Sequence, residues 1–329
     1  MSDADAPAEP IADALTSVLR GADPCASVLS VRALSAGASR HTFEVETASG
    51  GHRERLVLQV NREGGLAGAI DVSAQVALLR AADAVGVPVA SVVAFDDGVG
   101  GAPGAPFVLS RHVAGATLPQ RILRDVIYDA ARASFAADVG RVLAALHSVP
   151  TSGLPPLPDD DELERVAGWI EDVGDAVPAF ELAIRWLRSH RPVALPPVLV
   201  HGDFRLGNVI VGPDGLRAVL DWEMCHLSDP AEDLAWVTLR PWRFRGPGEV
   251  GGIGSMGDLT GSYVAAGGDP AAVEPERLHW WRVLGTLKWG SICQRQARTH
   301  LDGLTRSVEL AAIGRRVCET ELDLLELTP

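Results

Sequence analysis

VLVHGDFRLGNVIVGPDGLRAVLDWEMCHLSDPAEDLA, the stretch from Val198 to Ala235, decides the fold of this chain. Asp203 follows a short apolar run, Asn208 comes five residues later, and Asp221 closes a second apolar run. Short apolar runs that end at such polar residues predict two short strands. Strands in these places would carry the three polar side chains to one cleft.

These three side chains suit the transfer of a phosphoryl group. An attacking hydroxyl needs a carboxylate that orients it and accepts its proton, a role that we assign to Asp203. Mg²⁺ prefers hard oxygen ligands and binds few protein groups directly, so Asn208 and Asp221 are the predicted metal ligands. Either aspartate taken alone could be a turn or cap residue. The three together, at this spacing, favour the catalytic interpretation.

The same stretch resembles the signature of known kinases. Protein kinases carry H-R-D-x-x-x-x-N followed by D-F-G, and here HGD at 201–203 precedes Asn208, with LDW at 220–222 in the second place. The chain resembles the aminoglycoside phosphotransferase and choline kinase group of small-molecule kinases. Three segments are most similar to the branch related to the kinase-like domains attached to some acyl-CoA dehydrogenases: HGDFRLGNVIV, AVLDWEM and LSDPAEDLAW. The resemblance implies an α+β, bilobal protein-kinase-like fold.

Other polar residues of this stretch are assigned supporting roles. We expect His201 to hold the loop by hydrogen bonds. The resemblance implies that Asp229 and Asp233 brace the loop. Glu223 could reach a metal ion, but we expect it to be exposed.

Patterns along the rest of the chain predict a small lobe and a larger one. The 329 residues exceed the usual size of one domain, which favours two lobes that share a cleft. We predict an N-terminal nucleotide-binding lobe over residues 1–112, with an N-terminal helix, and a C-terminal catalytic and substrate-binding lobe over residues 113–329. The first would hold a small antiparallel sheet, and the second would be mainly helical.

Local periodicity supports this division. Three strands are predicted between residues 31 and 60, a helix over 70–85 that Gly86 ends, and two more strands at 89–95 and 107–110. In the larger lobe, residues 129–147 have a strong helical period, 243–257 reads as a mobile Gly-rich loop, and 278–325 is largely helical.

The resemblance places ATP in the smaller lobe, although GTP stays open. The segment SAGASR at 35–40 lies between two predicted strands, where the family has its phosphate-covering loop. Gly37 would let the backbone approach the phosphates, Ser39 could donate a hydrogen bond, and Arg40 could add positive charge. Taken alone, this segment reads as a plain hairpin turn.

One feature departs from the kinase pattern. Kinases place a lysine on the third strand and pair it with a glutamate on the following helix. The single lysine of this chain, Lys288, lies far from both places, and the two positions align with Gln59 and Gln75. Two amides can hydrogen-bond to each other, so the helix could still be positioned. We expect weaker nucleotide binding unless Arg40 or Arg62 supplies the missing charge.

Two functions are therefore open. The first is an ATP- and Mg²⁺-dependent kinase that phosphorylates a hydroxyl of a small molecule, either a hydroxylated metabolite such as a hydroxyacyl-CoA or an aminoglycoside-like compound. The second is a pseudokinase, which would act as a regulatory module that binds a nucleotide or another ligand. The intact catalytic and metal residues favour the kinase. An acidic group at 159–164 would suit a cationic acceptor. A set of arginines would suit a CoA thioester: Arg240, Arg243, Arg245, Arg295 and Arg298. The branch resemblance favours a metabolic hydroxyl.

Composition excludes several other classes. A formal net charge of -14 and an isoelectric point near 5.0 argue against a nucleic-acid partner, because phosphates would be repelled. The four cysteines are far apart and the first residues lack the features of a signal peptide, so we expect a cytoplasmic protein with reduced thiols. No apolar stretch reaches the length that spans a membrane. The oligomeric state is not predicted.

Overall fold

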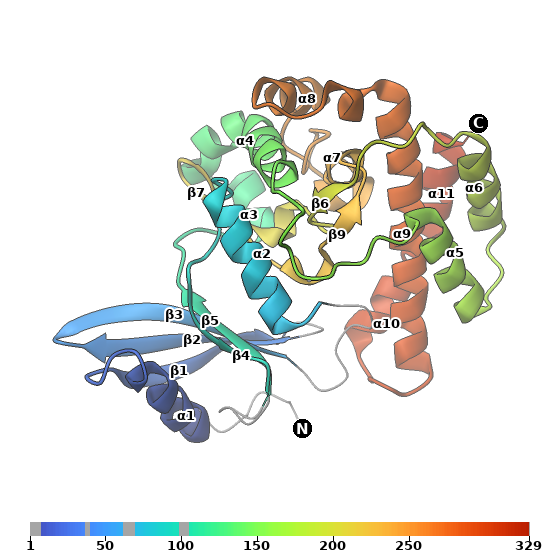
Figure 1. The fold of residues 1–329 in the computed structure, drawn as a ribbon. Helices are drawn as coiled ribbons and strands as arrows, with labels where there is room; N and C mark the ends of the chain where they lie inside the picture. Colours follow the sequence, from blue (N-terminus) through green and yellow to red (C-terminus); the bar gives the residue numbers. More distant parts are fainter. Residues whose placement is uncertain (1–7, 37–39, 62–69, 99–104, 329) are drawn as a thin grey trace.

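The computed structural model describes residues 8–36, 40–61, 70–98 and 105–328. An antiparallel sheet forms the N-terminal part, and helices dominate the C-terminal part (Figure 1). The predicted arrangement of a small sheet followed by a larger helical region is thus confirmed. The lobe boundary at residue 112 stays a prediction.

Five antiparallel strands form the N-terminal sheet in the order β1-β2-β3-β5-β4. Their bounds are β1 (Ser27–Ala36), β2 (Arg40–Ser49), β3 (His52–Asn61), β4 (Val92–Asp96) and β5 (Phe107–Arg111). Gly50 and Gly51 join β2 to β3 with φ angles of 55° and 85°. A two-residue hairpin of type I′ needs positive φ at both positions, which glycine adopts without strain.

The two faces of this sheet have different partners. One face packs on α1 (Ala8–Arg20), and the cluster consists of Leu15, Leu19, Ala26, Phe43, Val45, Leu56, Leu58, Phe107 and Leu109. On the other face, Val108 packs against α2 (Val72–Ala84). Gln59 lies opposite both Val108 and Thr42 in the register, and strand alternation puts Arg40 on that same face. The sheet therefore presents Arg40 and Gln59 toward α2.

Helix α2 joins the sheet to the C-terminal part. Asp71 caps its first turn by accepting a hydrogen bond from the backbone nitrogen of Ala74 at 2.6 Å, and Gly86 follows its end with a φ of 88°. Just before the helix, the backbone nitrogen of Ile70 donates to the carbonyl oxygen of Glu223 at 3.4 Å. This contact links the helix to the stretch that carries Asp221.

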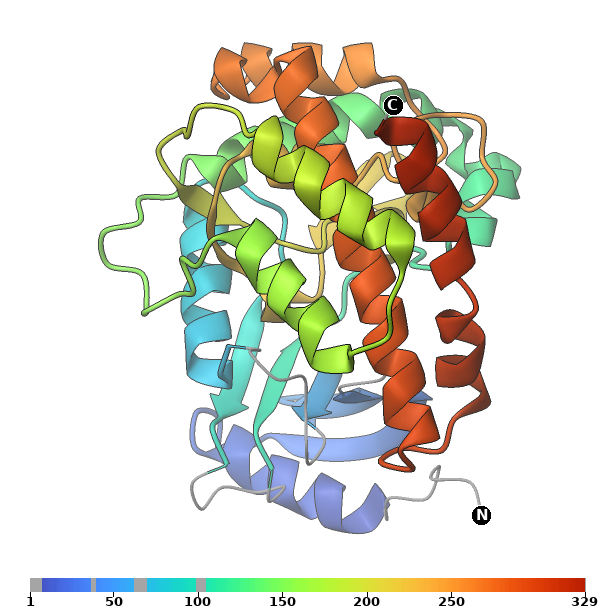
Figure 2. The same cartoon turned by 90° about the vertical axis from the view of Figure 1, so that its right-hand side faces the viewer.

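Several helices of the C-terminal part pack against one long helix, α9. Its α-helices are α3 (Pro119–Arg124), α4 (Asp129–His147), α5 (Glu162–Val173), α6 (Pro178–Ser189), α7 (Ala231–Trp236), α8 (Met256–Ala265), α9 (Pro275–Leu301), α10 (Val308–Gly314) and α11 (Val317–Leu327). Figure 2 shows α5 and α6 lying across α9, with α11 beside them. Trp280 and Trp281 of α9 are buried, whereas Trp289 is half-buried.

Two small antiparallel sheets carry the decisive stretch. Strand β6 (Val198–Val200) pairs with β9 (His226–Ser228), and β7 (Val209–Gly212) pairs with β8 (Gly215–Val219). Short 3₁₀ turns lie between them at η2 (Leu206–Asn208) and η3 (Trp222–Met224). The strands predicted before Asp203 and Asp221 are both present, in different sheets.

The Gly-rich segment after α7 is packed, not a loose loop. It begins at η4 (Arg240–Arg243), and bridges join Gly248 to Gly252 and Val250 to Gly254. Val250 is fully buried. The prediction of a mobile loop is therefore not supported. Within the described ranges, no helix combines the length and the apolar character needed to cross a membrane.

Candidate active site

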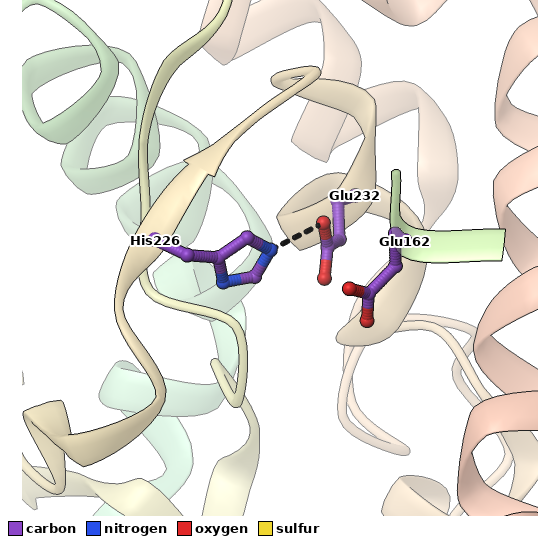
Figure 3. Close-up of side chains that lie close together, drawn as sticks. All are labelled: Glu162, His226 and Glu232. Carbon is purple, nitrogen blue, oxygen red and sulfur yellow. Dashed lines mark hydrogen bonds and ion pairs between the residues drawn. The ribbon is translucent and has the colours of Figure 1, made fainter. Parts of the chain in front are cut away.

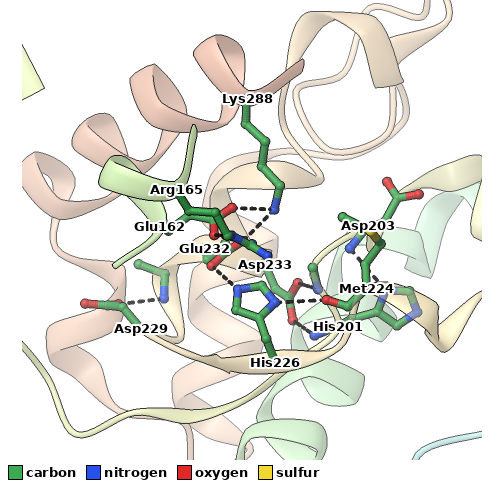
Figure 4. Close-up of polar contacts among 12 residues, drawn as sticks. Glu162, Arg165, His201, Asp203, Met224, His226, Asp229, Glu232, Asp233 and Lys288 are labelled. Atoms are coloured by element: carbon green, nitrogen blue, oxygen red, sulfur yellow. Dashed lines mark hydrogen bonds and ion pairs between the residues drawn. The ribbon is translucent and has the colours of Figure 1, made fainter. Parts of the chain in front are cut away.

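The loop after β6 has a backbone that only glycine fits. Gly202 has a φ of 77°, and a Cβ there would lie 2.5 Å from the carbonyl oxygen of Met224. The backbone nitrogens of His201 and Gly202 donate to the carboxylate of Asp233, at 2.7 and 3.0 Å (Figure 4). Asp233 thus holds the turn from which Asp203 projects, in agreement with the predicted bracing role.

His201 is a structural residue of this loop. Its Nε2 donates to the carbonyl oxygen of Leu220 at 2.9 Å, and its Nδ1 accepts from the backbone nitrogen of Asp203 at 3.2 Å. One nitrogen donates and the other accepts, so the ring is neutral. Complete burial lowers the pKa of His201 and keeps it neutral. The hydrogen-bonding role predicted for His201 agrees with these contacts.

The carboxylate of Asp203 accepts hydrogen bonds from three side chains. Asn208 Nδ2 lies 2.6 Å from Oδ2, Arg205 Nε lies 3.0 Å from Oδ1, and Trp236 Nε1 lies 2.9 Å from Oδ1. A carboxylate offers about four acceptor positions, so three N–H donors leave room for a hydroxyl group. The side chain also keeps 19% of its surface exposed, which leaves it accessible to an acceptor.

Asp221 lies next to this carboxylate with an unusual backbone and an unusual pKa. It has a φ of 65°, a left-handed conformation that aspartate tolerates better than most residues. Leu220 fixes its position, since its backbone nitrogen donates to the carbonyl oxygen of Asn208 at 2.8 Å. Burial, followed by repulsion from Glu223 and Asp203, raises the pKa of Asp221 to about 7.

This donor set fits a magnesium ion. A buried carboxylate that lies beside other carboxylates is stabilised by a divalent cation, and Mg²⁺ uses few protein ligands beside phosphate oxygens. The amide nitrogen of Asn208 is bonded to Asp203, which leaves its oxygen as the atom suited to a cation. Asp221 and Asn208 are thus chemically suitable, and their role as ligands stays a prediction.

Arg40 joins the N-terminal sheet to this site. It is buried, its Nη2 donates to Gln75 Oε1 at 2.7 Å, and it lies 3.4 Å from Glu223 Oε2. Gln75 in turn donates to the carbonyl oxygen of Ile70 at 3.0 Å. The suggested bond between Gln59 and Gln75 is therefore wrong, because the amide of Gln75 binds Arg40 and the backbone instead.

The prediction for Glu223 has a definite outcome. Glu223 is buried and ion-paired with Arg40, so the expectation of an exposed glutamate is wrong. The chemical cause is the guanidinium beside it, which makes a buried carboxylate tolerable. Gly37, Ser39 and Arg62 lie outside the described residues.

Comparison with known proteins identifies the family. A family model described as the phosphotransferase enzyme family matches residues 30–271. The chain belongs to the phosphotransferase enzyme family. Its membership confirms the predicted resemblance and the prediction of a phosphotransferase.

Curated relatives of this phosphotransferase include acyl-CoA dehydrogenase family members. Member 11 from Mus musculus is 28% identical over 341 residues, which cover 92% of this chain and 41% of the relative. Member 10 from Mus musculus is 30% identical over 216 residues, or 62% of this chain and 20% of the relative. The chain thus spans from a fifth to about two fifths of the length of these relatives.

Solved structures of similar shape confirm the predicted protein-kinase-like fold. A putative aminoglycoside phosphotransferase from Ralstonia eutropha JMP134 superposes with a TM-score of 0.72 at 21% identity, covering 96% of this chain and 97% of that one. Aminoglycoside phosphotransferase APH(4)-Ia, in a ternary complex with AMP-PNP and hygromycin B, gives a TM-score of 0.64 at 17% identity, with the same shares covered.

Asp229 braces the phosphotransferase at a greater distance from Asp203. It forms an ion pair with Arg277 of α9 and accepts from the backbone nitrogen of Ala231 at 2.9 Å. These contacts tie the start of α7 to α9. Together with the bonds of Asp233 to the loop, they agree with the bracing role that the resemblance implied for both aspartates.

Sequence reasoning missed Arg205 and Trp236. Both donate to Asp203, and the Arg205 guanidinium also lies 4.8 Å from the ring centre of Trp242. Arg205 is two residues from Asp203, so proximity could have suggested it. Trp236 is 33 residues away, and no spacing rule indicates its contact.

Proposed function

We propose that this phosphotransferase transfers the γ-phosphoryl group of ATP to a hydroxyl of a small molecule in the presence of Mg²⁺. One observation carries the proposal. The accessible carboxylate of Asp203 is bonded to Asn208 at 2.6 Å and lies beside Asp221, whose pKa the neighbouring carboxylates help to raise. This is the arrangement that a proton acceptor next to a metal site requires.

The proposed roles follow from the contacts. Asp203 would orient the acceptor hydroxyl and take its proton as the oxygen bonds to the γ-phosphorus and the bond to the β,γ-bridging oxygen breaks. Asn208 and Asp221 would hold Mg²⁺, which neutralises charge on the phosphate oxygens. The solved relatives with AMP-PNP or ADP support a nucleotide as the phosphoryl donor.

The proposed nucleotide site lies between the N-terminal sheet and the metal residues. Arg40 and Gln59 share a sheet face, and Gln75 holds Arg40 in place. Arg40 would supply the positive charge that kinases place on the third strand. Gly37 and Ser39 stay predicted parts of the phosphate-covering loop.

Replacing Arg40 with glutamine should weaken Mg·ATP binding about 10- to 100-fold, because a charge-assisted hydrogen bond contributes about 1.5 to 3 kcal/mol. Gln59→Ala should have a smaller effect. Isothermal titration calorimetry measures both. The control is Arg32→Gln, since Arg32 is an exposed arginine of the same sheet, paired with Glu44. A loss with Gln59→Ala as large as that with Arg40→Gln would contradict the assignment to Arg40.

Side-chain contacts weaken the case for a cationic acceptor. In the acidic group at 159–164, Glu162 is buried against Lys288, and Asp161 caps α5 and pairs with Arg191. Glu162 is thus neutralised inside the protein and Asp161 at its surface. The arginines that would suit a CoA thioester also have partners within the protein in part, since Arg240 pairs with two carboxylates of α11. Since residues of both charge sets have partners within the protein, the acceptor class rests on the relatives. These are acyl-CoA dehydrogenase family members, so we infer a hydroxylated metabolite, such as a hydroxyacyl-CoA, ahead of an aminoglycoside.

Transfer of labelled phosphate from ATP tests the proposal. The acceptors are hydroxyacyl-CoA thioesters of several chain lengths, with hygromycin B and spectinomycin as the aminocyclitol comparison. We expect a Mg²⁺-dependent phosphorylated product from at least one thioester. Phosphorylation of the antibiotics alone would reverse the acceptor assignment. No product together with no Mg²⁺-dependent nucleotide binding, in folded protein, would favour the pseudokinase.

A further inference from the structure

Trp236, the last residue of α7, approaches Asp203 from outside the catalytic loop. Its indole nitrogen lies 2.9 Å from Asp203 Oδ1, and the residue is only 3% exposed. The other donors to this carboxylate among the described residues, Arg205 and Asn208, belong to the same loop as Asp203. Trp236 therefore ties the carboxylate to the helical body of the protein.

A buried cation lies against the indole ring. The ammonium of Lys288 lies 5.1 Å from the ring centre of Trp236, and Lys288 is 1% exposed. Such a cation–π contact is strongest where water is excluded. Lys288 is itself fixed, because its ammonium lies 2.9 Å from Glu162 Oε1 and 2.9 Å from Glu232 Oε1.

Glu162 and Glu232 belong to a wider charge network with His226 (Figures 3 and 4). Glu232 Oε2 lies 3.0 Å from His226 Nε2, and Nδ1 of the same ring lies 2.9 Å from the carbonyl oxygen of Met224. Both ring nitrogens face acceptors, so both donate and the ring is cationic. Burial opposes this charge, but Glu232 and Glu162 together outweigh it and raise the pKa of His226.

This cluster is an ion-pair network and not a metal centre. Glu162, His226 and Glu232 bring ligand atoms within 4.8 Å of one another, a spacing that could hold a metal ion. The ammonium of Lys288 bonds to both carboxylates, and Arg165 pairs with Glu162. Cations of the protein thus occupy the place that a metal ion would take.

Helix α7 couples this network to the catalytic loop. Glu232 faces Lys288 and His226, Asp233 binds the loop backbone, and Trp236 binds Asp203. Breaking a buried ion pair leaves an uncompensated charge, so the network holds α7 in one position. The indole nitrogen consequently has a fixed place relative to the loop.

We propose that Trp236 is a positioning residue for Asp203, and that the buried Lys288 network holds Trp236 in place. The proposal rests on the proposed function of Asp203 as the proton acceptor. The indole donor keeps Oδ1 in one orientation, so that the remaining acceptor position of the carboxylate points consistently at the attacking oxygen. Misplacing a proton acceptor lowers turnover more than it changes nucleotide binding.

Hydrolysis of Mg·ATP, with water as the acceptor, tests this without knowledge of the natural substrate. Trp236→Phe keeps the ring over Lys288 and removes only the donor. We expect kcat for phosphate release to fall about 10- to 100-fold, as for a lost hydrogen bond to a charged group, with KM for Mg·ATP unchanged. The control is Trp280→Phe, since Trp280 donates to the carbonyl oxygen of Leu187, also at 2.9 Å, far along the chain from the loop. It should lower thermal stability and leave kcat unchanged.

A double-mutant cycle separates positioning from a general structural effect. In the Asp203→Asn background, Trp236→Phe should cause no further fall in the residual kcat, because the group that it positions is already lost. An equal fall of kcat in both backgrounds, or a wild-type kcat in Trp236→Phe, would overturn this inference but not the proposed function. A folded wild-type protein that neither releases phosphate nor binds Mg·ATP would overturn the proposed function and this inference with it.

Discussion

Replacing Asp203 with asparagine should lower kcat by about 10²- to 10⁴-fold, the range by which a general base contributes to catalysis. Asparagine has nearly the same shape but cannot accept the hydroxyl proton. It can still bond to Trp236 through its amide oxygen, so the loop should keep its structure. Nucleotide affinity, measured by calorimetry, should stay within a few-fold of that of the wild-type protein.

A matched aspartate provides the control for this change. Asp214 lies in the turn between β7 and β8, where it is exposed and pairs with Arg217. Asp214→Asn makes the same chemical change within the same stretch of sequence and should leave kcat unaltered. If Asp203→Asn retained more than about a tenth of wild-type kcat, the assignment of Asp203 as the proton acceptor would be wrong.

The second large effect concerns Asp221→Asn, which should remove the Mg²⁺-dependent part of ATP affinity. An amide is neutral and a weaker ligand for a hard cation than a carboxylate. Asparagine also tolerates the left-handed backbone at this position, so the loop should not be strained. Calorimetric titration with ATP, with and without Mg²⁺, measures the change. Unaltered Mg²⁺ dependence would exclude Asp221 as a ligand.

The same substitution should stabilise the metal-free protein, with a defined pH dependence. The carboxyl of Asp221 ionises near 3.8 in the unfolded chain but near a pKa of about 7 in the folded one. The unfolded chain thus holds fewer protons between these values, so the free energy of unfolding of the wild type falls as pH rises from about 4 to 7. Above pH 7 the advantage of Asp221→Asn should reach at most about 4 kcal/mol.

Denaturant unfolding at pH 5 and pH 8 measures this advantage, and Mg²⁺ should reduce it by binding the wild-type carboxylates. An advantage that is larger at pH 5 than at pH 8 would contradict the cause given for the raised pKa. Together, the two assays would show that Asp221 costs stability in the absence of metal and contributes binding in its presence.

Local patterns predicted the elements around the site but not their long-range partners. The helix over 129–147 and the strands before Asp203 and Asp221 have clear apolar periods, and the structure has them. Strands of three to five residues, however, take their partners from segments that burial brings together. Nothing in the sequence of β9 (His226–Ser228) indicated that it pairs with β6.

Side-chain contacts between the N-terminal sheet and the C-terminal part were harder still to predict. From residue type alone, Glu223 was predicted to be exposed and Gln75 to hydrogen-bond with Gln59. The structure buries Glu223 beside Arg40 and turns Gln75 to that same guanidinium. The ion pair joins residues 183 positions apart in the sequence. It depends on how the sheet packs against the C-terminal part, and local sequence patterns do not predict that packing.

The reactivity of Lys288 toward amine reagents should report when the folded protein opens locally. It is the chain's single lysine and is 1% exposed, and although burial opposes its charge, Glu162 and Glu232 outweigh that cost and raise its pKa. Amine-directed acylating reagents need an accessible, unprotonated amine. They should therefore spare this side chain in the native state. The rate at which Lys288 takes up one label, measured by mass spectrometry, would give the rate at which α5, α7 and α9 separate.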